Sequence, residues 1–340
     1  MKDRNNLKRS IFIYKKITLF FLFFLFWQVG NVEASSSYAV IDVQTGRLLE
    51  GSNESVELPI ASLTKVWTAL TVLDNASLED EITISQAAAT QEGSSLYLKP
   101  GEVWTVNSLL HGLMLQSGND AAYALAEHVG GSIDGFTHLM NEKFQVAGLK
   151  NSHFTNPSGL HSDDHFASAY DMANMFRLAL QNEQFKEIAS AKSFQPKERN
   201  IRWSNKHRLI HDKEIAIAGK TGYTKRAGRT LVTYFKEDDK EIVVVTLNHS
   251  NDWAYHTSLA ERVFANYDSV KVVKKGKYRV FQKEVIEVED DQYLLLSKEE
   301  RKKLKNVLLI PRKTTATNPY LWNVTIDDQI ALRFSVNKIK

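Results

Sequence analysis

The chain of 340 residues contains no cysteine. Disulfide bonds, a thiolate nucleophile and cysteine-based zinc sites are therefore excluded. Internal repeats and low-complexity segments are also absent. With 43% hydrophobic and 24% charged residues, the composition is that of an ordinary globular protein, long enough for one large domain and a small one.

No apolar run at the N-terminus is long enough to cross a bilayer comfortably. The apolar segment Ile17–Trp27 has only 11 residues. It follows six basic residues and precedes Val32-Glu33-Ala34, which has the small residues that a signal peptidase reads. This pattern predicts a signal peptide over residues 1–34, cleaved after Ala34. The protein is then exported and extracytoplasmic, either secreted or associated with the cell wall or membrane. The alternative is an uncleaved N-terminus that attaches it to the membrane, although Lys15 and Lys16 interrupt a longer span.

The charge balance gives no sign of a nucleic-acid partner. The formal net charge is +3, but the first 34 residues contribute six basic and two acidic groups. The remaining chain is therefore close to −1. Its apparent basicity lies in the targeting segment, so we expect no nucleic-acid binding.

Strand patterns occur at both ends of the first 270 residues, and helical patterns lie between them. Such an order predicts an α+β fold, with one antiparallel sheet flanked by helices and built from distant parts of the chain. The predicted strands are 38–43, 215–218, 231–235 and 241–247, and the predicted helices are 62–73, 106–116, 121–129, 136–145, 170–181 and 254–265.

The composition changes after about residue 267. A basic connector, 271–277, precedes short strands predicted at 278–281, 285–288 and 293–296. The last segment alternates apolar and polar residues from Ile330 to Val336, which is strand periodicity. Residues 298–305 read as a solvated helix or loop. We therefore predict domains at 35–268 and 270–340, the second small and β-rich, with no amphipathic membrane helix at its end.

Ser62-Leu63-Thr64-Lys65 is the first pattern that could carry chemistry. Positions i and i+3 share one face of a helix, so the Ser62 hydroxyl and the Lys65 amine come within reach of each other. A serine hydroxyl needs a base to become a nucleophile, and a lysine serves only if its pKa falls. Alone, this pattern is weak, because chance produces it in chains of this length.

Two further patterns add to it. Ser117-Gly118-Asn119 lies at a turn between two predicted helices, where a serine can relay a proton and an asparagine can hold a carbonyl. The same residues could instead serve only to cap the two helices, with no role in chemistry. Lys220-Thr221-Gly222 follows a predicted strand and offers a cation, a hydroxyl and a close backbone approach. These residues could instead form a turn with a surface lysine and have no role in chemistry. Three such patterns in this order, however, are hard to obtain by chance.

Four longer blocks resemble those of the serine D-alanyl-D-alanine carboxypeptidases, the low-molecular-mass penicillin-binding proteins. They are residues 59–65, 117–122, 156–160 and 219–224, and the resemblance covers roughly residues 36–268. It implies a β-lactamase/transpeptidase-like fold. It also implies removal of the terminal D-alanine from peptidoglycan pentapeptides, and covalent inhibition by β-lactam antibiotics.

The resemblance also implies a role for each residue. Ser62 forms the acyl-enzyme, Lys65 accepts its proton and Ser117 passes a proton to the departing amine. Five further positions bind substrate: Asn119 orients the amide, Lys220 and Thr221 hold the carboxylate, Gly222 allows close approach, and the Tyr223 N–H joins that of Ser62 in holding the oxyanion. No cofactor and no metal is implied. Trp67 and Arg229-Thr230 depart from the family pattern and leave substrate preference open.

Three alternatives remain at this stage. A β-lactamase shares the nucleophile, but the chain has no Glu-x-x-x-Asn block between Ser117 and Lys220 to drive fast deacylation. A wall-binding protein that acylates without turnover would be favoured by an incomplete Ser/Lys/Ser/Lys set, and the set is complete. The spacing of His161 and His165 could recruit a metal, but spacing alone is weak evidence.

Overall fold

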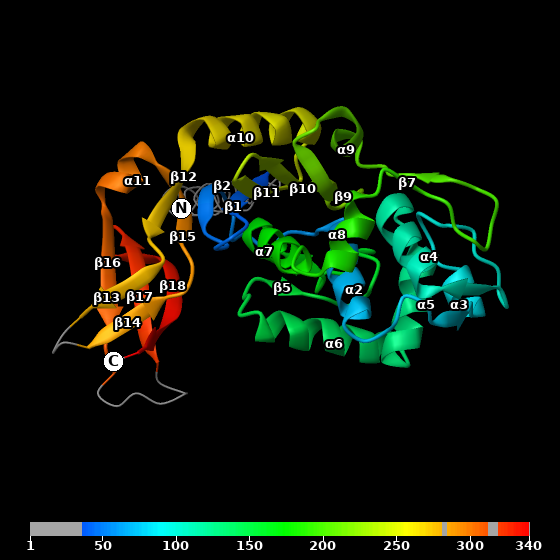
Figure 1. The fold of residues 1–340 in the computed structure, drawn as a ribbon. Coiled ribbons are helices and arrows are strands. Elements are labelled where there is room, and N and C mark those ends of the chain that lie inside the picture. Colours follow the sequence, from blue (N-terminus) through cyan, green and yellow to red (C-terminus); the bar gives the residue numbers. More distant parts are fainter. Residues whose placement is uncertain (1–35, 281–283, 312–318, 340) are drawn as a thin grey trace, which may run out of the picture. The chain divides into compact units, whose positions relative to one another are not determined.

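The computed structural model describes residues 36–280, 284–311 and 319–339, and the predicted signal peptide lies outside them. Its central feature is a five-stranded sheet with the order β2-β1-β11-β10-β9, in which every neighbouring pair is antiparallel (Figure 1). The strands come from two distant parts of the chain: β1 (Ser37–Asp42) and β2 (Leu48–Ser52) from the first, and β9 (Ala216–Thr224), β10 (Gly228–Glu237) and β11 (Lys240–Leu247) from the second.

Alternation along the strands divides the buried side chains between the two faces of this sheet. Val40 of β1 pairs with Val244 of β11, and the next pair is Ile41 with Val243. Val40 and Val244 belong to one apolar cluster, whereas Ile41 and Val243 belong to the other. Both faces are therefore covered, as the predominantly apolar strands require.

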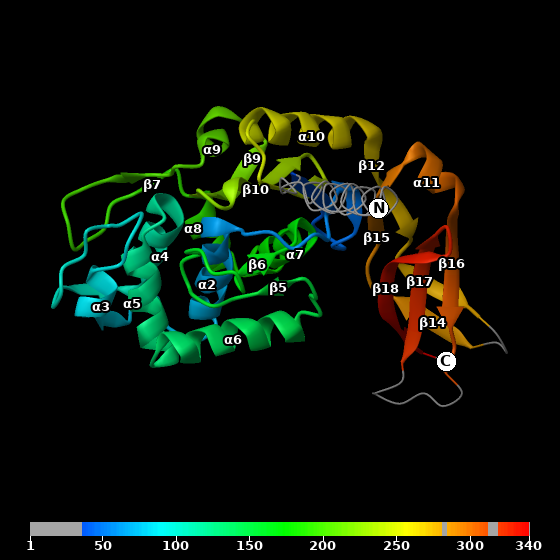
Figure 2. The same cartoon turned by 180° about the vertical axis from the view of Figure 1, so that it is seen from behind.

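Helices cover each face of the sheet. Helix α10 (Asp252–Asn266) packs on one face, with Leu259 and Val263 in the same cluster as Val244 (Figures 1 and 2). Helices α2 (Thr64–Leu73) and α7 (Ala169–Ala179) lie on the other face. Every residue of α2 except Leu73 is buried, so this helix runs through the core.

The long insertion between β2 and β9 forms a mainly helical region beside the sheet. Its remaining helices are η1 (Ala61–Leu63), α3 (Gln86–Ala89), α4 (Val106–His111), the π-helix η2 (Gly112–Gln116), α5 (Asn119–Gly130), α6 (Ile133–Val146), α8 (Glu183–Ser190) and α9 (Arg208–Asp212). Its short strands are β3 (Glu81–Thr83), β4 (Val103–Thr105), β5 (Ser152–His153), β6 (Phe166–Ala167), β7 (Ser193–Phe194) and β8 (Trp203–Ser204).

The last part of the described chain is rich in β-structure. A two-stranded sheet pairs β12 with β15, and a five-stranded sheet has the order β13-β14-β18-β17-β16. The elements are β12 (Tyr267–Val273), β13 (Gly276–Arg279), β14 (Val285–Val288), β15 (Gln292–Ser297), α11 (Lys298–Lys302), β16 (Leu304–Leu309), β17 (Tyr320–Ile326) and β18 (Gln329–Lys338). The predicted fold class, α+β with a C-terminal β-rich part, is confirmed.

Several local predictions need correction. The basic segment 271–277 is only in part a connector, because residues 271–273 end β12 and residues 276–277 begin β13. Residues 298–305 form the capped helix α11 and the start of β16. The predicted strand 278–281 begins earlier, as β13, and residue 281 lies outside the described residues. The domain boundaries at 35, 268 and 270 stay predictions.

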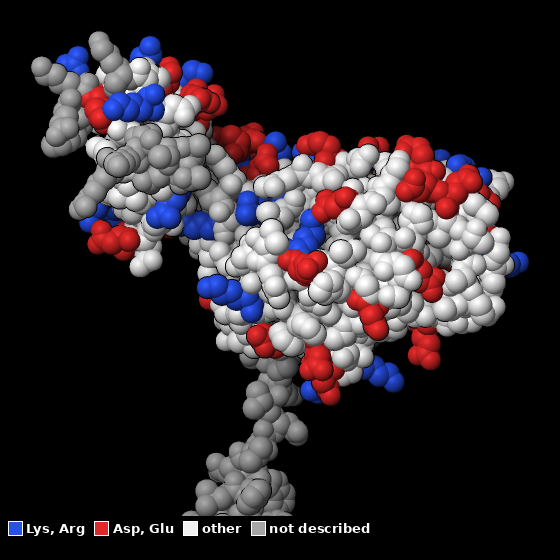
Figure 3. All heavy atoms as spheres, turned by 90° about the horizontal axis from the view of Figure 1, so that it is seen from below, with Lys and Arg blue, Asp and Glu red and all other residues white. Residues whose placement is uncertain are grey.

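Charges on the surface are mixed. On the face in Figure 3, basic and acidic side chains are interspersed and neither sign covers a continuous area. In the part of the chain that the structure describes, none of the helices has the length and apolar character needed to cross a bilayer.

Replacing a core aromatic tests the packing of the helices on the sheet. Phe176 on α7 is fully buried and meets Phe185 of α8 edge to face, with ring centroids 5.6 Å apart. We expect Phe176→Ala to lower the free energy of unfolding by about 3–5 kcal/mol, because it leaves a cavity. Urea denaturation measures this, with the exposed Val146→Ala as control, which should change stability by less than about 0.5 kcal/mol. Equal effects of the two variants would contradict the described core.

Candidate active site

Ser62 lies in a tight turn at the N-terminal end of α2. The residue before it, Ala61, has a positive φ of 49°, a conformation that L-residues rarely adopt. Ser62 itself is half-buried in the 3₁₀ turn η1 (Ala61–Leu63). Strain of this kind persists only where surrounding contacts impose it, and it is typical of functional turns.

A chain of hydrogen bonds stabilises this turn. The backbone N–H of Thr155 donates to Nδ1 of His165 (3.1 Å), so the neutral ring carries its proton on Nε2. That nitrogen contacts Oγ1 of Thr64 at 2.7 Å, and the Thr64 hydroxyl donates to the carbonyl of Ala61 at 2.9 Å. Burial lowers the pKa of His165 to about 3, which keeps the ring neutral. His165 therefore supports this turn around the predicted nucleophile Ser62, the nucleophile turn.

The block 156–160 packs against the same turn. Oδ1 of Asn156 accepts hydrogen bonds from the backbone N–H groups of Ser158 (3.1 Å) and Gly159 (2.7 Å). Gly159 has a φ of 82°, and a Cβ atom there would lie 1.8 Å from the carbonyl oxygen of Ala61. Only glycine fits at this contact, so the loop and the turn fix each other.

Lys65 is fully buried one helical turn after Ser62. Its Nζ donates to Oγ of Ser62 (3.1 Å), to Oδ1 of Asn119 (2.8 Å) and to the carbonyl of Ser158 (2.5 Å). The three acceptors come from three separated segments of the chain. These three contacts fix the position of Nζ. In its neutral form the amine keeps two N–H bonds for Asn119 and Ser158 and can turn its lone pair to the Ser62 hydroxyl.

Ser117 ends the π-helix η2 in the left-handed conformation, with φ 66° and ψ 33°. Its hydroxyl lies 3.1 Å from Nζ of Lys220, which donates to it. A π-helix adds a residue to the helical turn and is common at functional sites. The helix predicted over 106–116 is therefore two elements, α4 and η2, and Ser117 follows directly after the second.

Asn119 begins α5 with both ends of its side-chain amide engaged. Its Oδ1 accepts from Lys65 and its Nδ2 donates to the carbonyl of Glu92 at 2.5 Å. An amide has two N–H bonds, so one is left for a substrate carbonyl. The next residue, Asp120, is buried and accepts hydrogen bonds from the backbone of Leu96 and Leu98, which fixes the loop that borders the site.

Lys220-Thr221-Gly222 lies within β9, not after its end as the sequence suggested, because the strand continues to Thr224. Strand β9 pairs only with β10 and forms the edge of the sheet. A Cβ atom on Gly222 would lie 2.4 Å from Oγ1 of Thr230 and 3.0 Å from the backbone nitrogen of Ser62. Glycine thus allows the strand to approach the nucleophile turn closely.

The two lysines have strongly shifted pKa values. Burial lowers the pKa of Lys65 well below its usual range, and the nearby charge of Lys220 lowers it further. Burial also lowers the pKa of Lys220 to about 7, with a smaller effect from Lys206. Asp120 opposes the shift of Lys65. Burial and the charge of Lys220 both favour the neutral amine, which is the form of Lys65 that can accept a proton.

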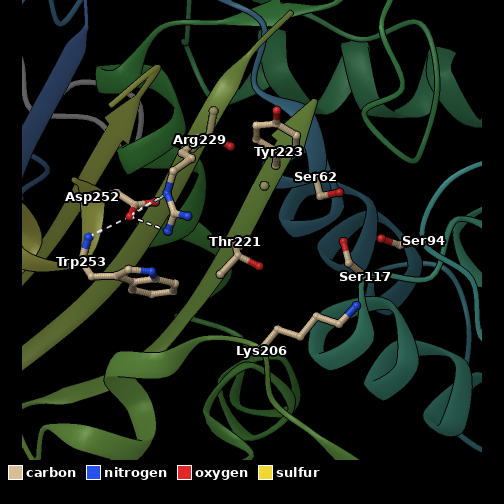
Figure 4. A pocket seen from close by; sticks show the side chains of 11 residues that line it. Ser62, Ser94, Ser117, Lys206, Thr221, Tyr223, Arg229, Asp252 and Trp253 are labelled. Atoms are coloured by element: carbon tan, nitrogen blue, oxygen red, sulfur yellow. Dashed lines mark hydrogen bonds and ion pairs between the residues drawn. The ribbon is translucent and has the colours of Figure 1, made fainter. Parts of the chain in front are cut away.

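A cavity of about 530 Å³ opens in front of these residues (Figure 4). Its walls include five of the eight predicted site residues. The other three, Lys65, Asn119 and Lys220, lie buried behind it. The lining residues are Ser62, Ser94, Ser117, Lys206, Thr221, Gly222, Tyr223, Arg229, Thr230, Asp252 and Trp253. The structure thus brings all eight predicted site residues to one place.

Sequence reasoning missed some parts of the site. Lys206 lines the cavity and donates to the carbonyl of Gln116 at 2.7 Å, but no motif surrounds it. Arg229 lines the cavity too, so its departure from the family pattern concerns the site. Trp67 does not: it is buried in the core and donates to the carbonyl of Met140, so it bears on packing.

The histidine pair does not form a metal site. His165 uses both ring nitrogens inside the protein, on Thr155 and Thr64, whereas His161 is near Asp163 at the surface. Among the described residues, no group of three or more His, Asp or Glu side chains could hold a metal ion.

A comparison with protein families decides the membership of this chain. A family model described as D-alanyl-D-alanine carboxypeptidase matches residues 28–251, which is more than half of the sequence. The chain belongs to this family. The resemblance found in the four sequence blocks is thereby confirmed.

Individual relatives agree with this. The chain is 32% identical over 254 residues to D-alanyl-D-alanine carboxypeptidase DacF of Bacillus subtilis, and 34% identical over 264 residues to DacA of Escherichia coli. The alignments span 72% and 73% of this chain but 65% of each relative's length. The solved structure of penicillin-binding protein 5 from Haemophilus influenzae matches with a TM-score of 0.76 and 25% identity, over 89% of this chain and 96% of that one.

A pair of glycine variants tests the contact between the loop and the nucleophile turn. Gly159 and Gly101 have nearly the same φ, 82° and 83°, but no atom lies within 4 Å of the Cβ position at Gly101. We expect Gly101→Ala to cost about 1–2 kcal/mol through backbone strain alone. Gly159→Ala should cost at least about 2 kcal/mol more, because the new methyl meets the carbonyl of Ala61. Chemical denaturation of both variants measures the difference, and equal losses would show that the contact is absent.

Proposed function

We propose that this protein is an exported serine D-alanyl-D-alanine carboxypeptidase, which removes the terminal D-alanine from peptidoglycan pentapeptides. The observation that carries the proposal is the distance of 3.1 Å between Nζ of the buried Lys65 and Oγ of Ser62, with the pKa of Lys65 strongly lowered. A neutral amine at this distance is a general base for the hydroxyl. Family membership supports the choice of substrate.

In the first step, Lys65 takes the hydroxyl proton as Ser62 attacks the penultimate D-alanine carbonyl. The negative charge on that oxygen is held by the backbone N–H groups of Ser62 and Tyr223. The close approach of β9 to the nucleophile turn at Gly222 supports this pairing. Because β9 is an edge strand, an extended peptide can also align along it through backbone hydrogen bonds.

Collapse of the intermediate breaks the amide bond. The departing D-alanine nitrogen receives the proton that Lys65 took from Ser62, relayed through the Ser117 hydroxyl, and Lys65 becomes neutral again. Lys220 is hydrogen-bonded to that hydroxyl and keeps its own proton. Thr221 lies in the cavity wall and, with the charge of Lys220 behind it, holds the terminal carboxylate. Asn119 directs its remaining amide N–H to the substrate. Water then hydrolyses the ester on Ser62 and frees the enzyme.

Two partner proposals follow from the same chemistry. A β-lactam presents a strained amide and a carboxylate in a similar arrangement, so β-lactam antibiotics acylate Ser62 and act as covalent inhibitors. The substrate lies outside the cytoplasm, in agreement with export through the segment 1–34. Retention of that segment would attach the enzyme to the membrane.

The serine mechanism is tested with the mature protein, a fluorescent penicillin and diacetyl-L-lysyl-D-alanyl-D-alanine. We expect lasting label on Ser62 and release of D-alanine, with Ser62→Ala lowering kcat/KM for release by about 10⁴-fold or more. Ser94→Ala is the matched control. Its hydroxyl also lines the cavity but hydrogen-bonds to neither lysine in the described structure, and less than a tenfold loss is expected.

Other outcomes separate the alternatives. Rapid loss of label without D-alanine release would indicate a β-lactamase, and lasting label without release would indicate a wall-binding protein. Full-rate release by Ser62→Ala would exclude the serine mechanism.

The pH dependence of kcat/KM tests the two lysines. The lowered pKa of Lys65 means that its free base forms as pH rises, so the rate should first increase with pH. Lys220 must keep its proton to attract the substrate carboxylate, and its pKa is about 7. The rate should therefore fall again above about pH 7. Thr221→Val should lower the rate without moving either limb, and a profile that stays level to pH 9 would contradict the role of the Lys220 charge.

A further inference from the structure

The cavity extends beyond the residues that the proposed reaction uses. In Figure 4, Thr221 stands between two groups of side chains. Ser62 and Ser117 lie on one side, and Arg229 and Trp253 lie on the other. If Thr221 holds the terminal carboxylate, then Arg229 and Trp253 border the space around the departing residue. D-Alanine has only a methyl side chain, which does not need such a wall.

The wall formed by Arg229 and Trp253 is held rigidly. Asp252 is 3% exposed and accepts hydrogen bonds from Nε (3.1 Å) and Nη2 (2.8 Å) of Arg229, and from the backbone nitrogen of Trp253 (2.9 Å). The guanidinium carbon lies 5.8 Å from the centroid of the Trp253 ring, within cation–π range. On another side the indole meets the ring of the buried His207 edge to face, at 5.3 Å. The indole is therefore fixed before any substrate arrives.

The chemistry of this wall fits an apolar side chain next to a carboxylate. The indole offers a flat apolar surface, which favours contact with a hydrocarbon group. Nη1 of Arg229 donates no hydrogen bond to the described residues, and the Arg229 side chain is 43% exposed. Lys206 and Lys220 add positive charge nearby. A carboxylate is attracted here even though Asp252 balances the charge of Arg229.

There is also space for more than a methyl group. Trp253 also borders a second hollow of about 410 Å³, whose other lining residues are mostly polar or charged. The space for a larger side chain is therefore that of the 530 Å³ cavity itself, which is much larger than a methyl group.

We propose that Trp253 and Arg229 form a leaving-side subsite for a C-terminal D-residue with an apolar side chain larger than methyl. The enzyme then releases D-leucine, for example, from a D-alanyl-D-leucine end. The bond between the D-alanine carbonyl and the leucine nitrogen breaks, that nitrogen takes a proton, and water later cleaves the ester on Ser62. The proposal rests on the proposed carboxypeptidase function.

The test compares diacetyl-L-lysyl-D-alanyl-D-alanine with the same peptide ending in D-leucine, by chromatography of the released amino acid. For the wild-type protein we expect kcat/KM for the D-leucine peptide to be within tenfold of that for the D-alanine peptide, or above it. Trp253→Ala should lower the ratio of D-leucine to D-alanine kcat/KM about tenfold. Trp253→Phe keeps an aromatic wall and should leave the ratio within threefold of wild type.

The outcomes distinguish the subsite from the function. A ratio that is unchanged in Trp253→Ala overturns the subsite, and so does a wild-type enzyme that cleaves the D-leucine peptide over 100-fold more slowly. The second measurement holds even if Trp253→Ala fails to fold. Release of neither amino acid by the wild type overturns the proposed function and the subsite together.

Discussion

The site depends on placing two lysines out of water within one cavity wall. An ammonium group loses several kcal/mol of hydration when buried, and the protein responds by lowering its pKa. Lys65 and Lys220 are both almost inaccessible, and the charge of Lys220 disfavours a charge on Lys65. The surrounding structure makes this arrangement tolerable, since Ser62, Asn119 and Ser158 supply acceptors for the Lys65 amine from three separated segments.

Much of this could be predicted from the sequence, because the relevant signals are local. The spacing of Ser62 and Lys65 already places them on one helical face, and the apolar run around Val244 already indicates a strand. The four blocks that resemble the family then indicated that segments far apart in the sequence belong to one site, which residue spacing alone cannot show. The fold class and the family followed from these signals, and the structure brings the eight predicted site residues together.

The rest could not be predicted because it depends on tertiary contacts. Nothing near Lys206 marks it as a cavity residue, and the carbonyl of Ser158 reaches Lys65 only because Asn156 folds its loop. Trp67 departs from the family pattern, yet its burial and its hydrogen bond to Met140 make it a packing residue. Conversely, His165 belonged to a spacing that suggested metal binding, whereas its environment makes it a neutral hydrogen-bonding support.

At Ser117, whose backbone is left-handed, the residue that is best for the stability of the fold differs from the residue that is best for activity. A side chain there carries conformational strain, which glycine would relieve. Glycine would also remove the hydroxyl that contacts Lys220. Selection for a more stable fold and selection for proton transfer therefore favour different residues at position 117, and the serine that occupies it shows which of the two requirements this protein retains.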